Sequence, residues 1–222
     1  MGFAIAIDGP AGSGKSSIAK RLAEKLGYIY VDTGALYRTI GLAVFRKAGK
    51  TDDPDIISEV AGDIDVDLGY NEKGQRVFLD GEDVSEEIRK EEISHMASVV
   101  SAVPFVRERL LDLQRSMARE HDVIMDGRDI GTVILPDADL KLFLLCPAEE
   151  RAKRRVAQLE KAGMEADYEQ ILKDIHIRDE RDTTREISPL KKADDAHEFN
   201  TVGHTADSSA EEIVERFGLC RK

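Results

Sequence analysis

The sequence predicts an α/β fold in which a parallel sheet is covered by helices on both faces. Short apolar stretches, at residues 3–7, 28–31, 123–125 and 140–146, alternate with longer segments whose apolar residues recur at helical spacing. Strands that alternate with helices in this way are typical of a parallel sheet wrapped by helices. A segment at about 63–103 interrupts the rhythm, and we expect it to form a small α+β insert.

Local signals delimit the individual elements. Glycines after residues 26 and 48 are helix stops, and a proline at position 54 suits the first turn of a short helix. In the first part of the chain we expect strand 3–7, helix 16–26, strand 28–31, helix 35–48 and a short helix opened by Asp53-Pro54. A hairpin of 64–68 and 76–79 around Asn71-Glu-Lys-Gly74 follows, and then helices 86–100 and 104–120. The last part should hold strands 123–125 and 140–146, helices 147–161 and 168–185, a weak strand near Phe199, and a last helix opened by the capping box Ser208-Ser209-Ala-Glu211-Glu212.

The composition excludes several classes of function. The 222 residues carry a formal net charge of −12, whereas nucleic-acid binding needs a broad basic surface. Cys146 and Cys220 are too few and too far apart for a disulfide framework or a metal-ligand set. Neither a signal peptide nor a stretch of ~20 apolar residues is evident. We therefore expect a cytoplasmic monomer whose partners are small molecules, without nucleic acid or membrane.

A glycine-rich motif follows the first strand. Residues 9–16, Gly-Pro-Ala-Gly-Ser-Gly-Lys-Ser, match the phosphate-binding loop (P-loop) pattern G-x-x-x-x-G-K-[ST] in full, between a predicted strand and a predicted helix. Glycines let consecutive N–H groups point at one phosphate, and the helix start adds its positive end. Lys15 can reach the β- and γ-phosphates, and the Ser16 hydroxyl can ligate Mg²⁺. The expected ATP-binding residues are Gly9, Pro10, Ala11, Gly12, Ser13, Gly14, Lys15, Ser16 and Ser17.

Three other interpretations of the motif fit less well. A chance Gly-rich turn does not explain a complete match in the right context. A dinucleotide-binding fingerprint has a partial G-x-G at Gly12 and Gly14 and an acidic Asp32 further on, but its third position is Ser17 rather than Gly or Ala. A switch GTPase needs D-x-x-G and N-K-x-D; residues 126–129 fail the first pattern and the second is absent from the sequence.

Arginine clusters indicate that the phosphoryl acceptor is itself a phosphate. An anionic acceptor needs no catalytic base, but it needs cations that hold two anionic groups together. Arg151, Arg154 and Arg155 share one helical face, and Arg178, Arg181 or Asp182, and Arg185 share another. Either run alone is more often a solvated helix face. Their repetition after a P-loop, in an acidic chain, favours binding of phosphates.

The chain resembles bacterial cytidylate kinases. The resemblance rests on Asp8–Ser16, Asp32-Thr-Gly-Ala-Leu-Tyr-Arg38, Gly81-Glu-Asp-Val-Ser85, Asp126-Gly-Arg-Asp-Ile-Gly-Thr132, and Arg178-Asp-Glu-Arg-Asp182 with Pro189-Leu190, in that order from residue 3 to about 195. It implies ATP- and Mg²⁺-dependent phosphoryl transfer to CMP and dCMP in pyrimidine nucleotide metabolism. One departure is the polar segment 196–202, which puts the last strand of the sheet in doubt.

The resemblance also implies a division of the molecule and its site. It gives a core (1–62, 104–146 and 186–222), a monophosphate-binding insert (about 63–103), a lid (about 147–164) and a helix, 167–185, that lines the site. The implied CMP-binding residues are Thr33, Arg38, Ser98, Arg107, Arg128, Asp129, Arg178, Asp182 and Arg185. The expected catalytic residues are Lys15, Arg128, Arg154 and Arg185.

Some assignments remain open at this level. Asp126 could orient a Mg²⁺-bound water or simply cap a turn at Gly127, and Thr33 could contact substrate or cap a helix at Gly34. The alternative functions are another nucleoside monophosphate kinase, acting on UMP or AMP, and a P-loop regulator without turnover.

Overall fold

The computed structural model describes residues 2–72 and 74–220. They form two compact units. The first unit runs through Ile29 and resumes at His121, and the second unit spans Tyr30–Glu120.

A parallel sheet is the centre of the first unit. Its strands are β1 (Ala4–Asp8), β6 (Val123–Gly127), β7 (Leu140–Leu145) and β8 (His197–Asn200), and β2 (Ile29–Asp32) adds a fifth, in the order β2-β6-β1-β7-β8. The β1–β6, β1–β7 and β7–β8 pairings are parallel. The predicted α/β class is confirmed, as is a strand around Phe199. Because β1 has a neighbour from later in the chain on either side, the loop after it occupies the position where such sheets bind ligands.

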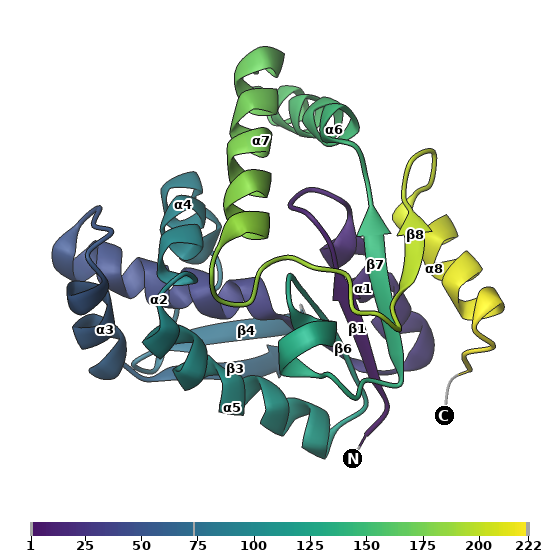
Figure 1. Ribbon diagram of the computed structural model, residues 1–222, viewed down its shortest axis with the longest axis horizontal. Helices are drawn as coiled ribbons and strands as arrows, with labels where there is room; N and C mark the ends of the chain where they lie inside the picture. The colour runs from purple at the N-terminus through teal and green to yellow at the C-terminus, as the bar shows by residue number, and fades with distance from the viewer. Residues whose placement is uncertain (1, 73, 221–222) are drawn as a thin grey trace. The chain divides into compact units, whose positions relative to one another are not determined.

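The helices of this unit lie in two places (Figure 1). Helices α1 (Lys15–Leu26) and α8 (Ala206–Arg216) pack against each other beside the sheet, whereas α6 (Ala148–Lys161) and α7 (Tyr168–Thr184) pack against each other beyond the end of β7. A π-helical turn, η2, lies at Ile130–Ile134. The capping box expected at Ser208 is wrong, because the box of α8 begins three residues earlier. Thr205 is the N-cap and accepts a hydrogen bond from Ser208 N, so the helix begins before Ser208 rather than after it. Ser208 completes the box by accepting from Thr205 N with its own hydroxyl.

The second unit combines helices with a small antiparallel sheet. Its helices are α2 (Thr33–Ala48), α3 (Pro54–Gly62), α4 (Glu91–Val100) and α5 (Pro104–Glu120), with a 3₁₀ turn, η1, at Glu87–Arg89. The sheet holds β3 (Val66–Asn71), β4 (Gly74–Leu79) and β5 (Glu82–Asp83) in that order. The β3–β4 hairpin is as predicted; Lys73 of its turn lies outside the described residues.

The single helix predicted for 86–100 is wrong. Lys90 adopts an extended conformation with φ −61° and ψ 145°, and it separates η1 from α4. Apolar periodicity continues through the break, because Ile88 and Ile93 are both buried in the same core. Periodicity therefore could not reveal the interruption.

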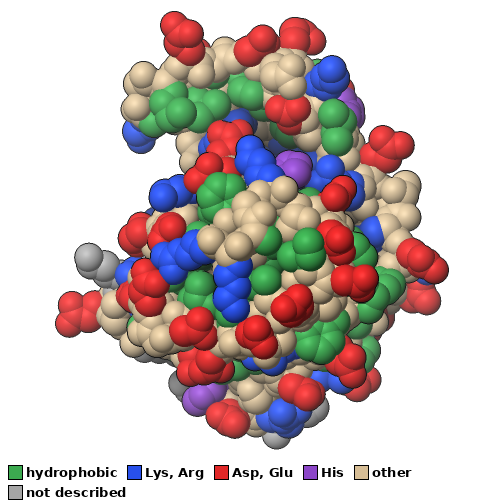
Figure 2. All heavy atoms as spheres, turned by 90° about the vertical axis from the view of Figure 1, so that its left-hand side faces the viewer, with side chains coloured by type: hydrophobic (Ala, Val, Ile, Leu, Met, Phe, Trp, Pro, Cys, Tyr) green, Lys and Arg blue, Asp and Glu red, His purple; other side chains and the backbone are tan. Residues whose placement is uncertain are grey.

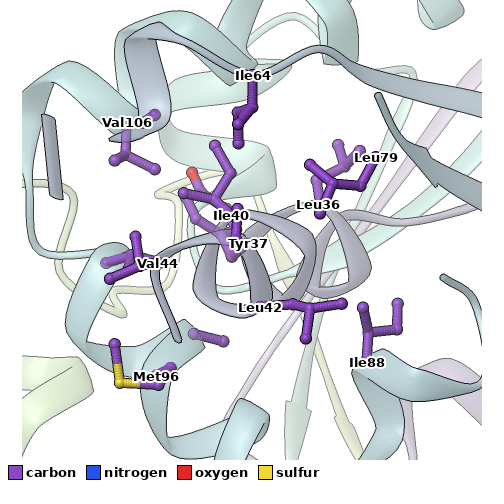
Figure 3. Packing of buried hydrophobic residues seen from close by; sticks show 14 of the residues in the cluster. Leu36, Tyr37, Ile40, Leu42, Val44, Ile64, Leu79, Ile88, Met96 and Val106 are labelled. Atoms are coloured by element: carbon purple, nitrogen blue, oxygen red, sulfur yellow. The ribbon is translucent and has the colours of Figure 1, made fainter. Parts of the chain in front are cut away.

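Helix α2 is the centre of the hydrophobic core of the second unit. Figure 3 shows its side chains Leu36, Ile40 and Val44 among others from α4, α5 and the small sheet. These three side chains are 0% exposed, and burying each contributes roughly 1.5–3 kcal/mol. The same helix carries Thr33 and Arg38 near its start, so this packing fixes the backbone of two expected site residues.

No described helix is both long enough and apolar enough to cross a membrane. Acidic side chains are spread over most of the face shown in Figure 2, in keeping with the net charge of the chain.

Candidate active site

The P-loop connects β1 to α1 in the first unit. Gly9, Gly12 and Gly14 have φ values of 147°, 76° and 93°, which side-chain-bearing residues rarely adopt. A Cβ at Gly9 would also lie 2.7 Å from the carbonyl oxygen of Leu144 on β7. The loop therefore needs glycine both for its backbone conformation and for its close approach to the sheet.

Lys15 lies at the first position of α1 and is 5% exposed. Its Nζ donates to Pro10 O at 2.6 Å and lies 3.4 Å from Ser13 Oγ, so the side chain folds back over its own loop. Burial lowers the pKa of Lys15 well below its ordinary value, and the neighbouring Arg128 lowers it further. An anion at this position would raise that pKa and favour the charged ammonium.

Ser16 and Asp126 place two side-chain oxygens close together beside the loop. Ser16 Oγ donates to Asp126 Oδ2 at 2.9 Å, which joins the start of α1 to the end of β6. Within the described residues no group of three or more His, Cys, Asp or Glu side chains is arranged to hold a metal ion. The donor set fits Mg²⁺ held by few protein oxygens together with substrate phosphates and water. This hydrogen bond gives Asp126 a role that neither sequence interpretation included, as an acceptor for the P-loop serine.

A cavity of about 500 Å³ opens next to the P-loop. It is lined by loop and α1 residues, by Arg154 and Gln158 of α6, and by residues at the start of α8. The Arg154 guanidinium contacts another lining residue of the cavity, because its Nη2 donates to Thr201 O at 2.7 Å. The volume is within the range of small-ligand pockets and is suited to the nucleoside part of a nucleotide whose phosphates enter the loop.

The three arginines of α6 differ in environment despite their shared face in the sequence. Arg151 is 4% exposed; it donates to Ala11 O and to Cys146 O at 3.0 Å, and it is ion-paired with Asp179 of α7. Arg155 is half-buried, and its Nη1 donates to Gln158 Oε1 at 3.1 Å. Only Arg154 of the three lines the cavity. Arg151 instead connects the P-loop, β7 and α7.

A second cluster of charges in the first unit joins α7 to the loop after β6. Arg128 Nε donates to Asp182 Oδ2 at 2.7 Å, and Arg185 Nη2 lies 3.7 Å from Asp129 Oδ1. Burial opposes ionisation of Asp182, but Arg128, with Arg178 and Arg185, holds its pKa below the ordinary value. Asp182 of α7 thus accepts its hydrogen bond from Arg128, a residue outside that helix.

Asp8 holds the loop that carries this cluster. It is 5% exposed, and its two carboxylate oxygens accept hydrogen bonds from Ile130 N and Gly131 N, each at 2.8 Å. The carboxylate thereby satisfies the first N–H groups of η2, directly after Arg128 and Asp129. Asp8 belongs to the motif quoted above, but no local pattern links it to residues more than 120 positions away.

The remaining expected residues belong to the second unit. Thr33 is 3% exposed at the first position of α2, and the N-cap is Asp32, whose side chain accepts from Ala35 N at 3.0 Å. The capping alternative for Thr33 is therefore wrong. Arg38 Nη2 donates to the other oxygen of Asp32 at 2.7 Å. Its Nε is buried and has no hydrogen-bond partner within the described residues.

Ser98 and Arg107 lie at the junction of α4 and α5. Arg107 is 9% exposed, donates to Ser101 O at 3.1 Å, and places its guanidinium 5.5 Å from the ring centroid of Tyr37. Ser101 Oγ in turn donates to Ser98 O at 3.0 Å. These contacts connect the junction to α2, the helix of Thr33 and Arg38.

Comparisons with known proteins identify the family of this chain. The family described as cytidylate kinase matches residues 5–218. The cytidylate kinase of Caldanaerobacter subterraneus subsp. tengcongensis is 52% identical over 212 residues, covering 96% of this chain and 91% of that protein. The cytidylate kinase of Caldicellulosiruptor saccharolyticus is 49% identical over 213 residues, covering 96% and 94%. Among solved structures, an uncharacterized protein from Eubacterium ventriosum has a similar fold, with a TM-score of 0.53, 16% identity, and coverage of 98% of this chain and 99% of that one.

Proposed function

We infer that this chain, which belongs to the cytidylate kinase family, is an ATP-dependent kinase that phosphorylates CMP. The products are CDP and ADP. The observation that carries this function is the buried Lys15 within a complete P-loop, in a chain that matches the family over nearly its whole length. Neither an AMP or UMP kinase nor a regulator without turnover is favoured by the relatives.

We propose that the P-loop residues 9–17 bind the phosphates of ATP and that the cavity beside them receives its nucleoside. Lys15 would leave Pro10 O and bind the β- and γ-phosphates, where its positive charge follows the charge of the transferred group. Arg154, which lines the cavity, would approach the same phosphates from α6. Mg²⁺, when bound, neutralises phosphate charge; Ser16 is its proposed ligand, with Asp126 orienting a coordinated water.

For CMP we propose two groups of residues. Arg38, Arg128 and Arg185 would hold its phosphate, since guanidinium groups pair with phosphate oxygens in a bidentate manner. Thr33 would lie along the same pocket, and Arg178 with Asp182 would contact the ribose. Arg128 and Arg185 are already tied to Asp182 and Asp129, which limits their freedom before the substrate arrives.

Base recognition is proposed for Asp129, Arg107 and Ser98. Cytosine presents an amino donor at N4 beside acceptors at N3 and O2, whereas uracil presents an acceptor at O4 and a protonated N3. A carboxylate that accepts from N4, with Arg and Ser as donors, fits cytosine and leaves two mismatches with uracil. Each unpaired buried group costs about 1–3 kcal/mol, so the preference should reach about 10² or more in kcat/KM.

The domain roles and the cellular setting are also proposals. Residues of about 63–103 would act as the monophosphate-binding insert, and those of about 147–164 as a lid over ATP. A lid matters because exclusion of water prevents ATP hydrolysis. We further propose that the protein acts as a monomer in the cytoplasm and accepts dCMP as well as CMP.

A coupled ADP-release assay across AMP, CMP, dCMP, UMP and GMP tests the function. We expect turnover with CMP and dCMP, little with UMP, and no ADP burst with ATP alone. Equal turnover of UMP or AMP would contradict the base assignment while leaving a monophosphate kinase. No turnover with any acceptor would favour the regulator.

A further inference from the structure

The side chain of Gln75 makes two hydrogen bonds with the backbone at the end of β2. Its Oε1 accepts from Asp32 N at 2.7 Å, and its Nε2 donates to Asp32 O at 3.2 Å. One amide therefore satisfies both backbone polar groups of a residue 43 positions away in the sequence. Gln75 belongs to β4 of the small sheet, and Asp32 is the N-cap of α2.

Asp32 is in turn the residue that orients Arg38. Its Oδ1 accepts from Ala35 N at 3.0 Å, and its Oδ2 accepts from Arg38 Nη2 at 2.7 Å. A Cβ at Gly34 would lie 3.1 Å from Asp32 Oδ1 and 3.2 Å from Arg38 Nη1, so this corner is tightly packed. A shift of the Asp32 backbone would therefore move both the helix cap and the guanidinium.

We propose that Gln75 is a positioning residue for the acceptor phosphate: it fixes the backbone of Asp32, and Asp32 holds Arg38 in the orientation that binds CMP. The inference rests on the proposed function, because it assumes that Arg38 contacts the CMP phosphate. Gln75 itself does not touch the substrate. Its contribution is to hold Arg38 in place before binding, which lowers the cost of ordering a long side chain when CMP arrives.

The chemistry of the amide explains why glutamine is needed. A carboxylate could accept from Asp32 N, but it has no proton for Asp32 O and would bring a second negative charge towards Arg38. Alanine removes both hydrogen bonds. Gln75→Glu and Gln75→Ala should therefore both weaken CMP binding, whereas a residue that only fills space would tolerate Glu.

The adjacent Arg76 offers a matched control. Consecutive side chains of a strand point to opposite faces, and Arg76 pairs with Asp83 and Glu86 rather than with Asp32. Arg76→Ala therefore perturbs the same strand without touching Asp32. We expect Gln75→Ala and Gln75→Glu to raise the KM for CMP about tenfold, with the KM for ATP within twofold of wild type, and Arg76→Ala to leave both KM values unchanged.

A second measurement tests the contact itself. The Asp32 amide should exchange its hydrogen at least about tenfold faster in Gln75→Ala than in wild type, without any ligand. An equal KM increase in Arg76→Ala, or a parallel rise in the KM for ATP, would overturn the proposal in favour of general loosening of the hairpin. Unchanged KM for CMP in both Gln75 variants would refute it while the kinase assignment stands. Wild-type protein without CMP turnover would refute the proposed function and this inference together.

Discussion

The hydroxyl of Ser16 and the carboxylate of Asp126 are joined by a 2.9 Å hydrogen bond across the P-loop. Ser16 is the second residue of α1 and Asp126 is the penultimate residue of β6, so the contact connects the P-loop to β6. Asp126→Asn keeps the shape but removes the negative charge that would orient a Mg²⁺-bound water. We expect the Mg²⁺ concentration for half-maximal activity to rise about tenfold, measured by titration at saturating ATP and CMP. An unchanged Mg²⁺ dependence with normal stability would leave Asp126 only a structural partner of Ser16.

Lys15→Ala tests the centre of the phosphoryl-transfer chemistry. The fold should persist, because the variant removes a buried charge whose pKa the surroundings already lower. The kcat should fall by at least about 10², since one preorganised charge at the transferring group is worth roughly 3 kcal/mol or more. Circular dichroism confirms folding, and steady-state kinetics gives kcat. A folded variant with near-native turnover would exclude the proposed role of Lys15.

Asp182→Ala tests whether Asp182 binds the ribose or only holds Arg128 in place. If the carboxylate accepts a hydrogen bond from the 2′-hydroxyl, the variant should lose about tenfold more kcat/KM with CMP than with dCMP. The hydrogen bond from Arg128 makes the opposite outcome informative, because loss of Asp182 also releases a proposed phosphate ligand. Equal losses for the two substrates would assign Asp182 to holding Arg128 alone.

The buried Asp8 predicts a pH-dependent stability. Burial, opposed by the two backbone hydrogen bonds, raises its pKa from 3.8 to about 6. As pH rises from 4, the unfolded chain loses this proton first, so the folded state loses stability until pH passes about 6. Relative to Asp8→Asn, wild type should therefore gain about 1 kcal/mol of unfolding free energy between pH 7.5 and pH 5. Urea unfolding of both proteins at each pH measures the difference in unfolding free energy. If that difference is the same at pH 5 and pH 7.5, the pKa of Asp8 is not raised.

Local patterns were sufficient for most of the fold. The P-loop could be identified because its glycines, its lysine and the start of the following helix are all contained in nine residues, and their conformation depends on one another. The strands and most helices follow from apolar periodicity and from stop signals such as Gly27 and Gly49. Where two elements share one buried face, as η1 and α4 do, periodicity cannot locate the break between them.

The sequence by itself determined the α/β class, the P-loop and the family, because each is identified from motifs or periodic segments whose own residues are close together in the chain. Only the tertiary structure decided which charged groups pair. Arg151 and Arg154 lie one helical turn apart on the same face, yet one is buried against Asp179 and the other lines the cavity. Asp8 reaches Ile130, and Gln75 reaches Asp32, through strands that are remote in sequence. Spacing defines a shared face of one element; the partner across that face comes from another element, and packing alone brings the two together.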